Sequence, residues 1–109
     1  MKELDKDLEK ISGGASSERT MGNYVLTEFV PASQVEAGHR YYFADNRVDA
    51  WYEAYVTKTS NKKYGCSTTK YYEVEEFASY YGGKETSSHR LVTEYVSNNY
   101  DAYRYMTMK

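Results

Sequence analysis

The sequence predicts a small, mainly β domain that follows a short N-terminal helix. The length of 109 residues fits one domain. Tyr occurs 14 times, and Val is the commonest aliphatic residue, whereas Leu and Ile are scarce; this composition is typical of β-sheets. Short apolar segments also alternate with clusters of turn residues. We expect about six antiparallel strands in two three-stranded units, arranged as a sandwich or a barrel.

The first 14 residues, MKELDKDLEKISGG, predict the helix. Leu4, Leu8 and Ile11 recur at helical spacing and would form one apolar stripe. Gly13 and Gly14 would end the helix, because glycine adopts the left-handed conformation without steric cost. The small polar residues 15–22 predict a flexible linker. Residues 23–109 then form a tyrosine-rich β domain.

Residues 1–14 resemble the double-glycine leader of bacteriocin-type precursor peptides. Asp7 and Leu8 lie at the eighth and seventh places before a cut after Gly14, and Ile11 lies at the fourth. The family usually has an apolar residue at the twelfth place, whereas Leu4 lies at the eleventh. The resemblance implies recognition of these four residues and cleavage after Gly14 by a peptidase-containing ABC transporter. The alternative is an amphipathic helix, capped by glycine, that packs on the domain.

The first half of the β domain predicts three strands. Residues 24–30 alternate and end before Pro31, which lacks the N–H that a central strand position needs. Residues 39–43 form the second strand, and the turn residues 44–47 follow it. The longest strand covers residues 48–59 and is followed by a polar loop over 60–65.

The second half predicts strands over 71–77, 90–96 and 101–108. An α+β alternative places one helix near 74–81, because Val74, Phe77, Ala78 and Tyr81 have helical spacing. The two halves share an order of features. Tyr-x-Leu-x-Glu-Phe at residues 24–29 parallels Tyr-x-Val-x-Glu-Phe at 72–77, and each segment precedes a His-Arg pair. This similarity is the reason for expecting two three-stranded units.

Several classes of function are not indicated by the sequence. No apolar run reaches the roughly 20 residues that a membrane helix needs. The formal net charge of −2 gives no general attraction to nucleic acid. The single Cys, Cys66, excludes a disulfide framework within one chain, and the common catalytic and phosphate-binding motifs do not occur. We therefore expect no enzyme activity, no cofactor, no metal site and no transmembrane segment.

Tyrosine is the residue type on which a binding function would depend. Adjacent pairs such as Tyr41-Tyr42 point to opposite faces of a strand, so one ring of each pair can face a partner. Tyrosine gives a large contact area at low entropic cost. The alternative is cross-strand packing of these rings in the domain itself. The predicted binding surface consists of Tyr41, Tyr42, Trp51, Tyr55, Tyr103 and Tyr105.

Two functions are consistent with these observations. The first is a bacteriocin-like or microcin-like protein, cytoplasmic as a precursor and secreted after leader removal, which binds a surface component of a target cell. The second is a non-toxic protein-binding module, exported or intracellular, that uses the same tyrosine-rich surface. Neither function requires catalysis.

Overall fold

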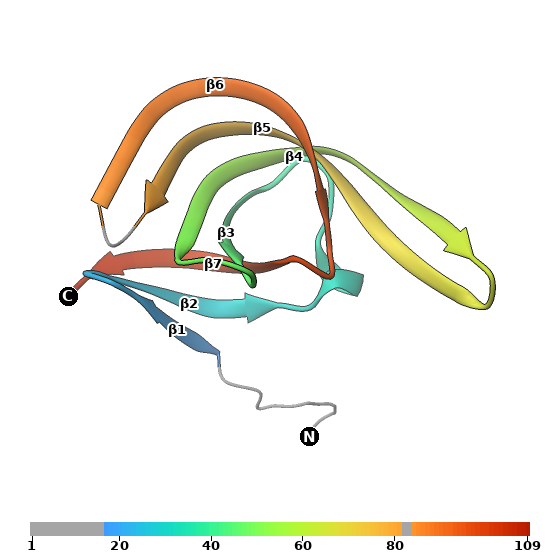
Figure 1. Ribbon diagram of the computed structural model, residues 1–109, viewed down its shortest axis with the longest axis horizontal. Helices are drawn as coiled ribbons and strands as arrows, with labels where there is room; N and C mark the ends of the chain where they lie inside the picture. Colours follow the sequence, from blue (N-terminus) through green and yellow to red (C-terminus); the bar gives the residue numbers. More distant parts are fainter. Residues whose placement is uncertain (1–16, 82–83) are drawn as a thin grey trace.

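The computed structural model describes residues 17–81 and 84–109, with the backbone alone for residues 84–87. The predicted leader, with Leu4, Asp7, Leu8, Ile11, Gly13 and Gly14, lies outside the described residues. The described residues form seven strands and one short 3-10 helix, η1 (Figure 1). These are β1 (Glu18–Met21), β2 (Tyr24–Val30), η1 (Ala32–Gln34), β3 (Arg40–Asp45), β4 (Ala50–Tyr64), β5 (Ser67–Tyr81), β6 (Lys84–Val96) and β7 (Tyr100–Met108).

All pairings between these strands are antiparallel, and they build one open sheet in the order β1-β2-β7-β3-β4-β5-β6. The prediction of a mainly β domain is confirmed. The predicted grouping into two three-stranded units is wrong, because β7 inserts between β2 and β3 and joins both halves of the chain in one sheet. The strand count also rises from about six to seven.

The additional strand is β1. The sequence analysis predicted a flexible linker over residues 15–22, but residues 18–21 pair with β2 at one edge of the sheet. The segment is polar and, apart from Met21, largely exposed, so it has no apolar alternation that identifies it as a strand.

The alternative helix near 74–81 is also wrong, because β5 continues as a strand to Tyr81. The helical spacing of its apolar residues has a local cause. The register with β4 shifts between Glu76 and Ala78, so Phe77 is an extra residue of β5 relative to β4. The register with β6 shifts at the same place, where β6 has two residues opposite Phe77. A β-bulge of this kind interrupts the two-residue alternation of a strand.

β4 and β5 form a hairpin that extends beyond the rest of the sheet (Figure 1). β3 pairs with β4 only as far as Tyr55, and β6 pairs with β5 only from Tyr71. Between these limits the two strands pair only with each other among the described residues. The predicted loop over 60–65 is therefore mostly strand, and the turn consists of Gly65 and Cys66 between the paired residues Tyr64 and Ser67.

The sheet buries side chains on both of its faces. Consecutive residues of β3 show this directly, because Tyr41 and Phe43 belong to one buried cluster, whereas Ala44 belongs to another. The larger cluster, here called the main core, takes side chains from six strands, β2 to β7. The smaller cluster surrounds Trp51 and includes Leu26. Where both faces of a strand are buried, side chains that point to either face can be aromatic. This accounts for tyrosine at adjacent positions.

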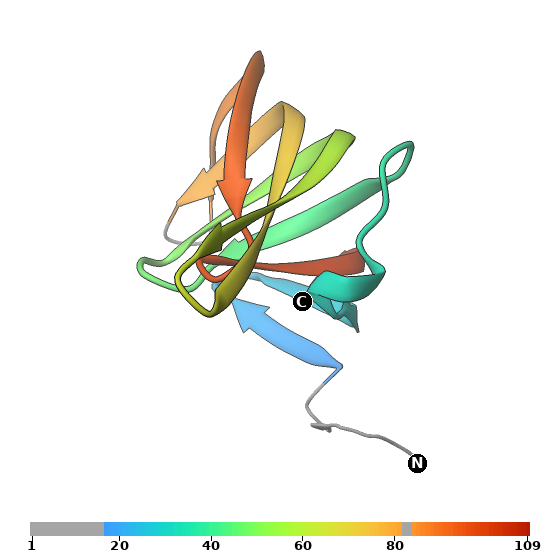
Figure 2. The ribbon, with the colours of Figure 1, turned by 90° about the vertical axis from the view of Figure 1, so that its right-hand side faces the viewer.

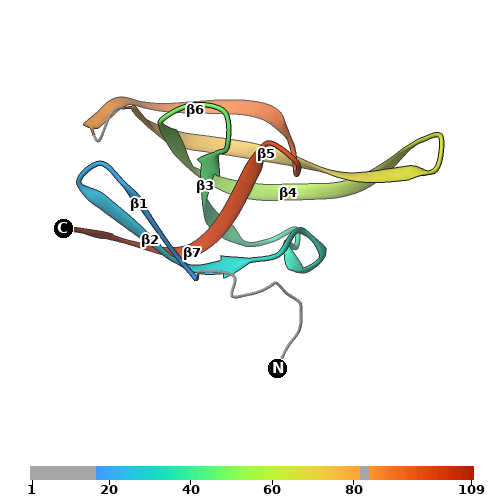
Figure 3. The same cartoon turned by 60° about the horizontal axis from the view of Figure 1, so that its bottom comes forward.

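The sheet is strongly curved (Figures 1 and 3), and contacts within the main core join strands that are not neighbours in it. β4 and β5 lie between β3 and β6 in the sheet. If the sheet were flat, β3 and β6 would be about 14 Å apart. The rings of Phe43 and Tyr95 from these two strands nevertheless meet with centroids 5.1 Å apart. β4, β5 and β6 therefore arch over the concave side, and Figure 2 shows the same curvature from the side.

Candidate binding surface

The structure does not bring the six predicted surface residues to one surface. Tyr41, Trp51 and Tyr103 are buried, with relative exposures of 1%, 1% and 4%. The prediction that these three rings face a partner is therefore wrong. Tyr42 and Tyr55 are half-buried, and Tyr105 is 55% exposed.

The three buried rings have structural partners instead. Tyr41 lies in the main core, and its hydroxyl accepts a hydrogen bond from the backbone N–H of Glu36 at 3.1 Å. Trp51 stacks on Tyr80 in the smaller cluster, with centroids 3.8 Å apart and an interplanar angle of 1°. Tyr103 packs edge-on against Phe29. These contacts correspond to the packing alternative that the sequence analysis left open.

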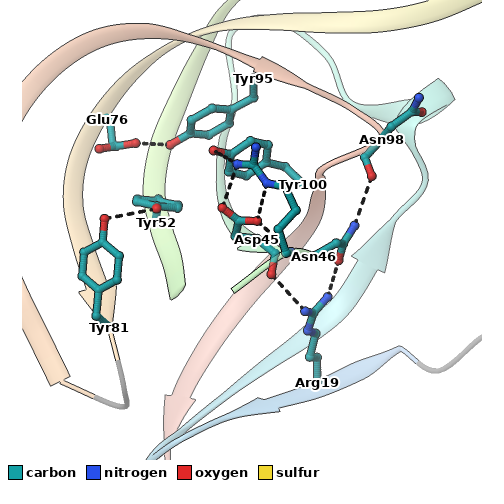
Figure 4. A network of polar contacts seen from close by, with 10 residues as sticks. Arg19, Asp45, Asn46, Tyr52, Glu76, Tyr81, Tyr95, Asn98 and Tyr100 are labelled. Carbon is teal, nitrogen blue, oxygen red and sulfur yellow. Dashed lines mark hydrogen bonds and ion pairs between the residues drawn. The ribbon is translucent and has the colours of Figure 1, made fainter. Parts of the chain in front are cut away.

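A different set of four rings lies at the rim of the main core, and three of them reach solvent. Four successive strands of the chain, β4 to β7, each contribute one tyrosine to this set (Figure 4). Tyr95 is buried, Tyr52 and Tyr100 are half-buried, and Tyr81 is 46% exposed. We call Tyr52, Tyr81, Tyr95 and Tyr100 the tyrosine cluster.

Ring contacts hold the tyrosine cluster together. Tyr95 and Tyr100 stack, with centroids 4.1 Å apart and planes 13° from parallel. Tyr52 lies 6.0 Å from both rings. Tyr52 and Tyr81 meet nearly at right angles, and their hydroxyls form a hydrogen bond of 3.3 Å. Edge and offset contacts of this kind add about 0.5–1.5 kcal/mol per pair beyond the buried area.

The buried carboxylate of Glu76 fixes the inner end of the cluster. The Tyr95 hydroxyl donates a hydrogen bond to Glu76 Oε2, and His89 Nε2 lies 2.9 Å from Glu76 Oε1. Glu76 is only 5% exposed, so these two partners replace water around a group that is costly to bury alone. The carboxylate thereby holds the Tyr95 ring in place against Tyr100.

Asp45 and Arg47 flank the outer side of the cluster. The Arg47 guanidinium donates to both oxygens of the buried Asp45 carboxylate, from Nε at 2.9 Å and from Nη2 at 2.9 Å. Nη2 also donates to the Tyr100 hydroxyl at 3.0 Å. The Arg47 side chain is 54% exposed and lies over the Tyr100 ring. A cation is thus held at a fixed place beside an accessible aromatic ring.

A second arginine ties this region to the edge of the sheet (Figure 4). Arg19 of β1 donates to Asn46 Oδ1 at 2.7 Å and to the backbone carbonyl of Asp45 at 3.2 Å. The backbone N–H of Asn46 donates in turn to the carbonyl of Asn99 at 2.8 Å. Strand β1, the β3–β4 turn and the β6–β7 turn are therefore joined, and the turn that carries Arg47 is fixed in position.

Burial changes the acid–base behaviour of this region. Burial raises the pKa of Tyr95 far above its ordinary value of 10, and the hydrogen bond to Glu76 raises it further. Burial also raises the pKa of Tyr52 and of Tyr100. The hydrogen bonds from Arg47 lower the pKa of Asp45 below 3.8. At neutral pH the cluster therefore presents protonated phenols beside an ionised Asp45–Arg47 pair.

This arrangement is suited to recognition by contact. Ring surface, hydroxyl groups and an arginine lie side by side, and these residue types are enriched in binding interfaces. The predicted binding surface contains residues of both strand faces, since Tyr41 and Tyr42 point to opposite faces, and it contains none of the four tyrosines of this cluster. Strand alternation assigns each residue to one face of the sheet. Which of these side chains reach solvent at the rim depends on the curvature of the sheet.

Comparison with protein-family models, with curated proteins and with solved structures found no match. In the described part of the chain, no helix has the length and apolar character needed to cross a membrane. Among the same residues, no group of three or more His, Cys, Asp or Glu side chains is placed to hold a metal ion.

Proposed function

We propose that this chain is the precursor of a secreted, bacteriocin-like binding protein. In this proposal a peptidase-containing ABC transporter recognises residues 1–14, cuts after Gly14 and exports the remainder. The exported β domain then binds a surface component of a target cell. The observation that carries the proposal is the spacing of Asp7, Leu8 and Ile11 before Gly13-Gly14.

The position of the described domain supports this division of the chain. β1 begins at Glu18, so only residues 15–17 separate the expected cut from the first strand. An expected cut after Gly14 therefore falls before the first described strand.

The tyrosine cluster supports binding as the role of the domain. It offers the 46% exposed Tyr81, the half-buried Tyr52 and Tyr100, and the Arg47 guanidinium on rigid elements of one sheet. Aromatic and arginine side chains at a rim supply contact energy without a large loss of side-chain freedom. We assign target binding to this cluster rather than to the buried ring of Trp51.

Digestion of the full chain with the peptidase domain of a transporter that processes double-glycine leaders tests the proposal. Mass spectrometry should show loss of residues 1–14 and a product that begins at Ala15. Gly14→Val should block the cut, because a branched side chain obstructs the narrow cleft that accepts two glycines. Leu8→Ala and Ile11→Ala should slow cleavage at least tenfold, since each removes part of the apolar stripe that docks in a groove.

Lys10→Ala is the matched control for these variants. It changes a residue inside the same segment but leaves the apolar stripe and the two glycines intact, so its cleavage rate should equal that of the wild type. An intact Gly14–Ala15 bond, under conditions in which the peptidase cuts a known substrate, contradicts the leader assignment.

The second candidate function is a non-toxic protein-binding module, exported or intracellular. The same tyrosine cluster supports it, and it requires no processing of residues 1–14. Labelled protein comprising residues 15–109 separates the two candidates when it is added to bacterial cells. Saturable binding that is lost in Tyr81→Ala supports a cell-surface target, whereas binding equal to that of an unrelated protein supports the second candidate.

A further inference from the structure

Strand β6 presents an unpaired edge. It is the last strand of the sheet, and within residues 17–81 and 84–109 no strand pairs with its outer side. From Leu91 to Val96 it pairs regularly with β5 on its inner side. Leu91 is 50% exposed and Val92 is 76% exposed. A free edge with exposed apolar side chains is a template for another strand.

We propose that β6 pairs with β6 of a second copy of this chain, antiparallel about a two-fold axis at Val92. In this register Val92 of one copy lies opposite Val92 of the other. Arg90 lies opposite Glu94 of the second copy, and symmetry repeats this pair on the other side of the axis. The charges on β6 therefore favour a second copy of this chain as the partner that pairs with this edge.

The charges favour this register over its neighbours. Val92 and Glu94 lie on one face of β6. Arg90 adjoins a register shift, but it contacts Glu75, the β5 residue opposite Val92, and therefore lies on the same face. A symmetric antiparallel pair with its axis at Arg90 would oppose two arginines, and one with its axis at Glu94 would oppose two glutamates; like charges directly opposite are destabilising. An axis at Val92 is the one that gives two opposite-charge pairs.

The intramolecular partners of these residues extend the same alternation. Arg90 Nε contacts Glu75 Oε2, and Lys62 Nζ lies 3.6 Å from Glu94 Oε1. Across the dimer interface, positive and negative side chains then alternate. Lys62 and Glu94 of one copy are followed by Arg90 and Glu75 of the second copy. The Arg90 side chain is 76% exposed and that of Glu94 is 41% exposed, so both can accept another partner.

The apolar residues gain cover in the same register. Leu91 lies on the face of β6 opposite to Val92. The two-fold axis places Leu91 opposite Thr93 of the second copy. Both exposed apolar side chains of the strand are therefore covered by one pairing, and the sheet continues through the interface without a change of face.

Charge reversal tests the proposal in the full chain under reducing conditions, which exclude a link through Cys66. Sedimentation velocity should show a concentration-dependent dimer of the wild type. Arg90→Glu opposes two glutamates at each pair, and Glu94→Arg opposes two arginines. Each variant alone should dimerise at least about tenfold more weakly than the wild type. Arg104→Glu, an exposed reversal of the same size on β7, should dimerise like the wild type.

Mixing the two variants gives the sharper result. An equimolar mixture of Arg90→Glu and Glu94→Arg restores both opposite-charge pairs, so a heterodimer should form where neither variant self-associates. The protomers are identical in the mixture and alone, so altered folding of a variant cannot produce the difference. Native mass spectrometry identifies the heterodimer by its mass. A wild type that stays monomeric at millimolar concentration, or a mixture without heterodimers, overturns the proposal.

Discussion

Tyrosine serves two purposes in this chain, and the burial of the ring separates them. Where the ring is buried, the hydroxyl is paired with a backbone or carboxylate group, as in Tyr41 with Glu36 and Tyr95 with Glu76. At the rim, the Tyr81 hydroxyl pairs with that of Tyr52, and Tyr81 is 46% exposed. A buried tyrosine of the first kind fills core volume and also anchors a polar group.

The Tyr95–Glu76 contact gives a prediction at this scale. Tyr95→Phe removes the donor and leaves the buried carboxylate with one partner fewer, so the free energy of unfolding should fall by about 1–3 kcal/mol. Urea unfolding followed by Trp51 fluorescence measures the change. Tyr105→Phe, at a ring that is 55% exposed, is the control and should stay within about 0.5 kcal/mol of the wild type. Equal stability of the two variants would contradict the role given to Glu76.

Asp45 gives a prediction about acid. Because hydrogen bonds from Arg47 lower its pKa in the folded state, the unfolded chain binds the proton more readily. The resulting stability is present above pH 3.8 and is lost as pH falls through the lower folded pKa. Asp45→Asn should therefore lower stability at pH 6 and flatten its decline below pH 4, as measured by urea unfolding at several pH values. Asp49→Asn, at an exposed carboxylate of the same turn, should leave the decline unchanged.

At the scale of elements, the β4–β5 hairpin depends on its turn. Gly65 has φ of +62°, whereas Cys66 is not among the residues with positive φ. A positive φ at the first of two turn residues alone fits a type II′ turn, in which glycine is preferred. The pairing of Tyr64 with Ser67 and the contact of Lys62 with the Tyr71 ring both depend on this geometry.

Gly65→Ala should destabilise the domain by about 1 kcal/mol, because an L side chain is strained at this φ although no atom lies within 4 Å of the added Cβ. The midpoint of urea unfolding measures the effect. Cys66→Ala, at the next position, should leave the midpoint unchanged. If Gly65→Ala were as stable as Cys66→Ala, the turn would not require glycine.

Much of the strand content could be predicted from the sequence, since alternation follows burial. The strand over 24–30 matches β2 residue for residue, because Pro31 ends it. The outer part of the hairpin, residues 60–70, could not be predicted, because its side chains are almost all polar and show no alternation. The pairing of β7 with β2 and β3 could not be predicted either. It is a long-range contact, and no local pattern records it.

The same distinction applies to the candidate site. Alternation along β4 places Tyr52 and Trp51 on opposite faces, and the structure agrees. Trp51 is buried, whereas Tyr52 is half-buried. This difference depends on the curvature of the whole sheet, and no single segment of the sequence specifies that curvature. A binding role for tyrosine therefore stays a prediction, whereas three of the six residues predicted for the surface, Tyr41, Trp51 and Tyr103, are buried.

For the whole molecule, a core built of phenol rings predicts sensitivity to alkali. Burial raises the pKa of six tyrosines, so they keep their protons in the folded state at a pH where the unfolded chain loses them. Stability is then fully present below about pH 10 and falls as pH rises above it. The six are Tyr42, Tyr52, Tyr72, Tyr95, Tyr100 and Tyr103.

Urea unfolding from pH 8 to 11, with phenolate absorbance at 295 nm, measures this dependence. The expected decline above pH 10 should be shallower in Tyr95→Phe, which lacks one of the six groups. A free energy of unfolding that is constant across this range would show that the buried hydroxyls do not resist ionisation.

The division of the chain at Gly14 is the central claim at this scale. Residues 1–14 carry the export signal in this account, and the sheet from Glu18 to Met108 carries binding. The most direct measurement is the N-terminal residue and the mass of the protein in the culture medium of producing cells. The account predicts a chain that begins at Ala15. A chain that keeps Met1, or one found only inside the cells, would contradict it.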